Sequence, residues 1–181
     1  LRIMSGLDSQ FGGRVLVDGK NLTKSLQKKF SFVMQEESLL PWKTVSENIL
    51  FFAEILGRSV NPKKIIQEVG LEGFENHYPS ELSGGMKKRV SFARALITKP
   101  YILFMDEPFG ALDTITRWKM INLVMDLCRK HLITTIMVTH NIEEAVYLSD
   151  KVVLLKDAPA KVRHVYNIPF NRPRSREIVT N

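Results

Sequence analysis

The chain has 181 residues, of which 44% are hydrophobic and 25% charged, a length and composition typical of one globular domain with a buried core. Its longest apolar stretches fall well short of the roughly 18 residues that a membrane-spanning helix needs, which excludes an integral helical membrane protein. Most of the formal net charge of +7 lies from Lys151 onward, a pattern that favours a solvated, partly frayed terminus over a nucleic acid site.

Apolar periodicity and turn signals predict mostly helices in the first half of the chain. In chain order, we expect the end of a helix at residues 1–7, a hairpin turning at Asp18-Gly19, a strand at 30–34, a loop at 39–42, and helices at 44–56, 62–69 and 83–99. Thr44 and Glu47 have the spacing of a capping box. We therefore expect one domain over residues 1–181, with a helical subdomain inserted at 41–99.

Strands and helices alternate in the second half. We expect buried strands at residues 101–105, 134–138 and 152–155, a helix at 113–130 with Trp118, Ile121, Met125 and Cys128 on its apolar side, and a helix capped by Asn141. Cys128, the single cysteine, is expected to be a core thiol. The alternation predicts an α/β fold with a parallel sheet.

The strongest chemical signal is the pair Asp106 and Glu107, which directly follows the apolar run 101–105. A buried strand delivers both carboxylates to its C-terminal end, where open α/β sheets bind ligands. Adjacent carboxylates repel one another, so we expect a cation beside them, and Mg²⁺ on a nucleotide phosphate is the natural candidate. Taken alone, the pair also fits a strand that ends in an acidic turn.

A second signal is Ser83-Gly84-Gly85, at the start of a predicted helix. Ser83 has the place of a cap, and the two glycines leave the first amides of the helix bare. Bare amides and the helix dipole attract phosphate. An ordinary serine-capped helix after a glycine turn fits these residues equally well.

The order and spacing of these motifs resemble the ABC ATPase family over nearly the whole chain. Residues 82–85 resemble the family signature, residues 102–107 its Walker B strand, and residues 111–113 its D-loop. His140 resembles the switch histidine and Gln35 the Q-loop glutamine. The resemblance implies an α/β, RecA-like P-loop NTPase core, with a parallel sheet and flanking helices, plus the ABC helical subdomain.

ATP hydrolysis with Mg²⁺ is the activity that the resemblance implies. Asp106 would bind Mg²⁺, Glu107 would be the general base for the attacking water, and His140 would contact the γ-phosphate. Gln35 would reach both the metal and the water. Taken singly, His140 fits a polar residue at a strand end, and Gln35 a solvated loop side chain.

The resemblance also implies partners. Ser83, Gly84 and Gly85 would close on a nucleotide held by a second copy of the subunit, with Asp113 at that homodimer interface. Residues 39–42 and the helices after them would contact transmembrane permease subunits, so the protein would be peripheral on the cytoplasmic face of the membrane. A periplasmic or extracellular solute-binding protein would be an indirect partner, and no nucleic acid is expected.

The family's phosphate-binding loop, G-x-x-x-x-G-K-[ST], does not occur in these residues. Relatives carry it directly ahead of a segment like residues 1–8, so we expect a domain that is incomplete at its N-terminus and lacks the first strands. We also expect the strand at 101–105 to lack one neighbour, which leaves an unpaired apolar edge. Without this loop, residues 1–181 are expected to be inactive.

Within the family, residues 39–42 and 107–113 look most like importers of nitrate, sulfonates, taurine and related solutes. Residues 86–88, Met-Lys-Lys, replace the commoner glutamine-rich start of the signature helix, and we expect this to alter surface charge only. Two other functions stay open: a non-catalytic, truncated ABC relic that only binds partners, and a soluble ABC ATPase that acts on nucleic acid.

Overall fold

The computed structural model describes residues 1–179. The chain divides into two compact units, Leu1–Val138 and Thr139–Asn181. The helices of the first unit are α1 (Arg2–Ser5), α2 (Lys24–Gln27), α3 (Val45–Ile55), α4 (Lys63–Glu68), the 3₁₀ helix η1 (Pro79–Glu81), α5 (Gly84–Leu96) and α6 (Thr114–Lys130). Its strands are β1 (Leu16–Val17), β2 (Lys20–Asn21), β3 (Phe30–Val33), β4 (Ile102–Asp106) and β5 (Thr134–Val138). The second unit contains α7 (Ile142–Leu148), β6 (Lys151–Lys156), β7 (Lys161–Asn167) and η2 (Arg176–Val179).

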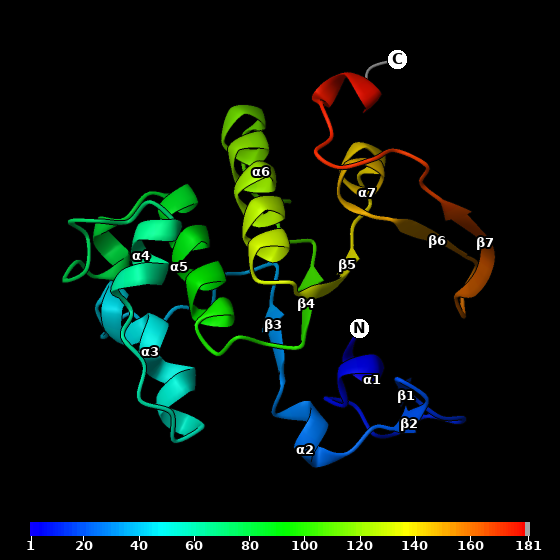
Figure 1. Ribbon diagram of the computed structural model, residues 1–181, viewed down its shortest axis with the longest axis horizontal. Helices are drawn as coiled ribbons and strands as arrows, with labels where there is room; N and C mark the ends of the chain where they lie inside the picture. The colour runs from blue at the N-terminus through cyan, green and yellow to red at the C-terminus, as the bar shows by residue number, and fades with distance from the viewer. Residues whose placement is uncertain (180–181) are drawn as a thin grey trace. The chain divides into compact units, whose positions relative to one another are not determined.

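A parallel sheet with the strand order β3-β4-β5 forms the core of the first unit (Figure 1). The first four residues of β4 are buried, as their continuous apolar run predicts. The expectation that this strand lacks a neighbour is wrong. Hydrogen-bonded strands, β3 and β5, flank both of its edges.

The strand β5 is more exposed than its sequence predicts. Its apolar run is typical of a strand buried on both faces, but Thr134, Thr135 and Val138 are exposed. Within residues 1–179, β5 pairs only with β4. An edge strand lacks the second neighbour that shields a central strand, so the same kind of sequence stays partly solvated here.

Helices α3, α4 and α5 gather on one side of the sheet (Figure 1), and residues 41–99 hold no strand. The predicted capping box is present at the start of α3: the Glu47 amide donates to Thr44 Oγ1 over 3.3 Å, and the Thr44 amide donates to Glu47 Oε2 over 2.7 Å. Helix α5 packs against α3, α4, α6 and β3. The bounds 41–99 of a subdomain stay a prediction.

The buried side of α6 differs from its predicted stripe. Its buried residues are Met120, Ile121, Val124 and Leu127. Trp118, Met125 and Cys128 are half-buried, so the expectation of a fully buried thiol at Cys128 is wrong. Several faces of this helix carry apolar residues, and the neighbouring elements decide which of them is covered.

The second unit contains an antiparallel pair, β6 with β7. The prediction of a buried strand at residues 152–155 is wrong about burial, because Val153, Leu154 and Leu155 are exposed. Strand β7 follows through a turn in which Asp157 adopts a left-handed backbone with φ 74°. A tight turn returns the chain antiparallel, whereas a parallel partner requires a long crossover.

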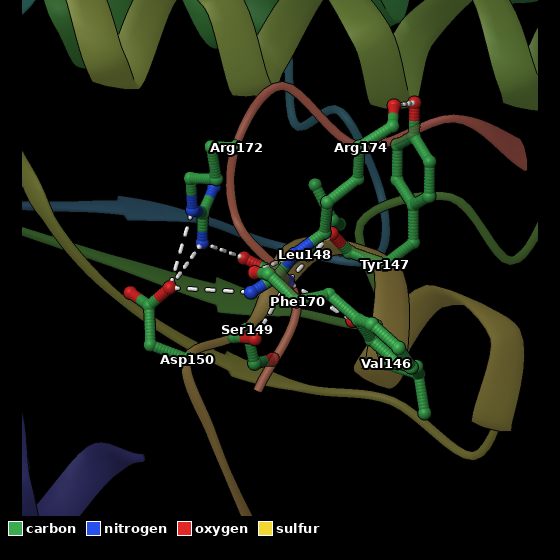
Figure 2. Close-up of polar contacts among 8 residues, drawn as sticks. All are labelled: Val146, Tyr147, Leu148, Ser149, Asp150, Phe170, Arg172 and Arg174. Carbon is green, nitrogen blue, oxygen red and sulfur yellow. Dashed lines mark hydrogen bonds and ion pairs between the residues drawn. The ribbon is translucent and has the colours of Figure 1, made fainter. Parts of the chain in front are cut away.

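The segment after β7 is not a frayed terminus throughout, because Arg174 is buried. Figure 2 shows its guanidinium among main-chain oxygens at the end of α7. These oxygens belong to Val146, Tyr147 and Ser149, at 3.0, 3.0 and 2.7 Å, and a fourth belongs to Phe170 at 3.0 Å. Arg174 therefore satisfies carbonyls that the end of a helix leaves without intrahelical donors.

Candidate functional site

Asp106 and Glu107 lie at the carboxyl end of the central strand. The register pairs Val33 with Met105 and Asp106 with Val138, so the three parallel strands end at the same edge of the sheet. Both acidic side chains are partly exposed there. The edge beyond the carboxyl ends of parallel strands is where α/β folds bind ligands.

Glu107 has an unusual backbone, with φ 40° in the left-handed region. Two main-chain hydrogen bonds hold it there: its amide donates to the Val138 carbonyl over 2.9 Å, and the Gly110 amide donates to the Glu107 carbonyl over 3.2 Å. A glutamate in this region is strained, and such strain persists where the surroundings enforce it, often at functional sites. The turn thus fixes the direction in which Glu107 leaves the strand.

Gln35 follows β3, the strand next to β4, and its side chain is exposed. Its main-chain oxygen accepts a hydrogen bond of 2.7 Å from Nζ of Lys88. The expectation that residues 86–88 alter only surface charge is wrong for Lys88, whose exposed fraction is 2%. Helix α5 packs this lysine against β3 and the loop beyond it. No motif singles out Lys88 in the sequence; the one available signal is that it lies four residues before Phe92, and therefore on the same helix face as that apolar residue.

The start of α5 is open at Ser83 and Gly84, which are exposed. Ser83 caps the helix, because its Oγ accepts from the Met86 amide over 3.3 Å. A Cβ added at Gly84 would meet no atom within 4 Å, whereas one added at Gly85 would lie 2.9 Å from Cγ2 of Thr116. The two glycines therefore have different surroundings: Gly84 faces open space and Gly85 faces α6.

Asp113 caps α6. Its Oδ1 accepts from the Ile115 amide over 3.1 Å and from the Thr116 amide over 3.0 Å. Hydrogen bonds from the Thr116 side chain and backbone hold the pKa of this carboxyl below its usual value. The side chain is exposed and acts as a charged N-cap of α6.

His140 belongs to the second unit, where it is exposed and directly precedes the cap of α7. The Glu144 amide donates to Asn141 Oδ1 over 3.1 Å, as the predicted cap requires. Thr139 adds two contacts: its Oγ1 accepts from the Asn141 amide over 3.0 Å and donates to Glu144 Oε2 over 2.7 Å. This network holds the backbone on both sides of His140.

The groups at the sheet edge fit magnesium and a nucleotide chemically. Asp106, Glu107 and Gln35 supply carboxylate and amide oxygens, the hard ligands that Mg²⁺ prefers. The open glycine at position 84 leaves room for a phosphate to approach the first amides of α5. The first unit brings Gln35, Asp106 and Glu107 to one edge of the sheet by strand register.

Known proteins resemble this chain over most of its length. The ABC transporter family model matches residues 1–110. The aliphatic sulfonates import ATP-binding protein SsuB of Bacillus cereus is 41% identical over 98% of this chain and 72% of its own length. An uncharacterized ABC transporter ATP-binding protein of Methanocaldococcus jannaschii is 45% identical over 97% of this chain and 67% of its own length.

A solved structure resembles it as well. It is the dimeric structure of an ATP-binding cassette in a post-hydrolysis state with ADP and Pi, at a TM-score of 0.77 and 29% identity, covering 94% of this chain and 79% of that chain. The predicted α/β fold of the P-loop NTPase type is thereby confirmed, and so is the resemblance on which it depends. The chain therefore belongs to the ABC transporter family of ATP-binding proteins, whose enzymatic activity is ATP hydrolysis.

Proposed function

We propose that this chain is the ATP-hydrolysing subunit of an importer, and that the imported solute is an aliphatic sulfonate or another small solute such as taurine or nitrate. The observation that carries the proposal is the carboxylate pair at the end of β4, whose second member is held in a left-handed turn. The solute class is taken from relatives in Bacillus cereus and Bacillus subtilis, at 41% and 42% identity, both named for the import of aliphatic sulfonates.

In this proposal the residues at the sheet edge share the work of hydrolysis. Asp106 and Gln35 would hold Mg²⁺, which would supply positive charge beside the nucleotide phosphates. Glu107 accepts a proton from the water that attacks the γ-phosphorus, while the bond from that phosphorus to the bridging oxygen of ADP breaks. The proposed contact of His140, a residue of the second unit, with the γ-phosphate rests on the family resemblance alone. The products are ADP and inorganic phosphate.

We further propose that two copies of the subunit face each other. Ser83, Gly84 and Gly85 of one copy would close on the γ-phosphate held by the other, with Asp113 at the interface. The open space at Gly84 supports this, because the first amides of α5 are accessible to an anion. The similar cassette of known structure is itself a dimer with ADP and Pi.

The loop 39–42, with the helices after it, is the proposed contact with the permease, at the cytoplasmic face of the membrane. Buried Asn48 shapes it: its Nδ2 donates to the oxygens of Leu40 and Lys43, at 3.1 and 2.8 Å, and its Oδ1 accepts from the Leu40 amide over 2.8 Å. Trp42 in this loop is 70% exposed. A large exposed aromatic residue on a well-held loop is a typical anchor for a partner protein. The solute-binding protein would act through the permease.

Growth of bacteria tests the function. A segment that carries the family's phosphate-binding loop, G-x-x-x-x-G-K-[ST], with the strand before it, is joined ahead of Leu1, and this chimera is called the P-loop-bearing subunit. It is expressed in Bacillus subtilis that lacks its own sulfonate-import ATPase. We expect it to restore growth on an aliphatic sulfonate as sole sulfur source, and Glu107→Gln to abolish that growth while growth on sulfate is unchanged.

Two results would contradict parts of the proposal. The first is a P-loop-bearing subunit that hydrolyses ATP when purified but, in cells that also contain the permease, supports growth on no sulfonate. That result would contradict the proposed solute class. A subunit that binds ATP but hydrolyses none, with or without the permease, would remove the enzymatic role assigned to Glu107.

A further inference from the structure

Lys88, in the second turn of α5, is a buried cation whose nitrogen faces main-chain oxygens. Its Nζ donates to the carbonyl of Met34 over 3.1 Å and to that of Gln35 over 2.7 Å. The nearest carboxylate with which it pairs is that of Glu37, at 4.0 Å. The two shortest contacts of this charge are therefore with the loop that carries Gln35.

Arg94, further along α5, holds the same loop. Its Nη1 donates to the Ser38 carbonyl over 2.8 Å and its Nη2 to the Glu37 carbonyl over 2.7 Å. Its guanidinium also lies 5.5 Å from the ring centre of Phe52 in α3, within the range of a cation–π contact. Together, Lys88 and Arg94 bind four carbonyls of residues 34–38.

Burying a charge is costly unless the charge is well compensated. Burial lowers the pKa of Lys88, and Glu37 opposes that shift only in part. If Lys88 only filled space between α5 and β3, an apolar side chain of similar length would serve as well. Nζ of Lys88 instead gives a charged donor to two adjacent main-chain oxygens, those of Met34 and Gln35, in partly buried hydrogen bonds.

We infer that Lys88 is a positioning residue, which fixes the peptide of Gln35 so that its side chain stays at the sheet edge beside Asp106 and Glu107. Because α5 begins at the cap Ser83, the same lysine links the Gln35 loop to the proposed phosphate-binding helix start. The inference rests on the proposed function of Gln35. In this role Lys88 would act through Gln35 and would not itself contact nucleotide or metal.

Hydrogen exchange of the 181-residue chain tests the structural half of the inference. In Lys88→Met we expect the amides of residues 34–38 to exchange at least tenfold faster than in the unmodified chain. Arg89→Met is the matched control, since Arg89 on the same helix donates through Nη1 to a different carbonyl, that of Val69, over 2.6 Å. It should leave residues 34–38 unchanged. Equal exchange in that loop in both variants would overturn the inference.

Kinetics of the P-loop-bearing subunit test the functional half. We expect Lys88→Met to lower kcat at least tenfold, to raise the Mg²⁺ concentration needed for half-maximal rate, and to change the KM for ATP less than threefold. In a Gln35→Ala background, the same substitution should lower kcat no further. A purely structural lysine would lower kcat by the same factor in both backgrounds, and that result overturns the inference.

The same experiment separates this inference from the proposed function. If Gln35→Ala alone leaves kcat and its Mg²⁺ dependence unchanged, the proposed role of Gln35 is wrong, and the positioning role falls with it. If Gln35→Ala lowers kcat and Lys88→Met does not, only the positioning role is wrong. If Lys88→Met does not fold, Lys88→Gln replaces it. Its neutral side chain keeps one donor group, so its kcat should lie between those of the unsubstituted subunit and Lys88→Met.

Discussion

Gly85 in α5 faces Thr116 in α6 so closely that a Cβ at position 85 would lie 2.9 Å from Thr116 Cγ2. Gly84, one residue earlier, faces open space. The two glycines thus have different surroundings, which suit different roles in the proposed function. Gly85 allows two helices to approach, and Gly84 leaves the helix amides accessible to a phosphate.

Alanine at each glycine should therefore have different effects. We expect Gly85→Ala to lower the free energy of unfolding by about 1–3 kcal/mol through overpacking, and Thr116→Ser, which removes Cγ2, to recover most of it. Gly84→Ala should change stability by less than about 1 kcal/mol but should weaken ATP-dependent dimerisation. Urea unfolding and size-exclusion chromatography with ATP measure the two effects. A stability loss from Gly84→Ala equal to that of Gly85→Ala would contradict this division.

Ser83 can be tested with a substitution that keeps the cap and changes the charge. Aspartate caps helices about as well as serine, so Ser83→Asp should leave the free energy of unfolding within about 0.5 kcal/mol. Its negative charge should repel a γ-phosphate and abolish dimerisation in ATP and Mg²⁺, in a P-loop-bearing subunit that also carries Glu107→Gln. Ser83→Thr is the control and should still dimerise. A dimer that persists with Ser83→Asp places the phosphate elsewhere.

Glu107→Gln should separate binding from chemistry. The amide keeps the shape of the side chain but cannot accept a proton, so the P-loop-bearing subunit should bind ATP with nearly unchanged affinity and hydrolyse it about 10²–10⁴-fold more slowly. Single-turnover hydrolysis and nucleotide binding measure the two quantities. An unchanged rate would show that another group is the base.

Glu68 should make stability depend on pH in the acid range. Burial tends to raise the pKa of Glu68, but Lys130 and His131, each 2.9 Å from its carboxylate, outweigh burial and lower the pKa below its usual value of 4.5. A lowered carboxyl pKa adds stability above pH 4.5, which is lost as the pH falls through the folded-state value. The difference in unfolding free energy between the wild type and Glu68→Gln should be about 1 kcal/mol at pH 7 and vanish toward pH 3. A difference that stayed constant from pH 7 to pH 3 would contradict this assignment.

Arg174 should be essential to the second unit. Removing its guanidinium in Arg174→Met leaves the carbonyls at the end of α7 without donors, which should cost about 2–4 kcal/mol and speed hydrogen exchange throughout α7. Arg163→Met, on an exposed position of β7, is the matched control and should cost less than about 0.5 kcal/mol. Equal exchange of α7 in the two variants would mean that the contacts in Figure 2 do not stabilise the helix.

Part of the candidate site was predictable from the sequence. The placement of Asp106 and Glu107 follows from an apolar run that ends in two acids, because such a run forms a strand of the sheet and a strand delivers its next residues to the sheet edge. The left-handed backbone of Glu107 was not predictable, since glutamate has no intrinsic preference for it and a hydrogen bond to Val138, 31 residues later in the chain, helps to hold it.

The sequence by itself determined the starts of the helices at Thr44, Ser83 and Asn141, because a cap needs only a side chain that reaches an amide three residues ahead. Tertiary structure alone decided that β5 lies at an edge, that β6 pairs with β7, and that Lys88 is buried. Strand pairing and burial depend on contacts between residues far apart in the chain. The sequence of a lysine or of an apolar run is the same whether a distant segment of the chain buries it or it is exposed to water.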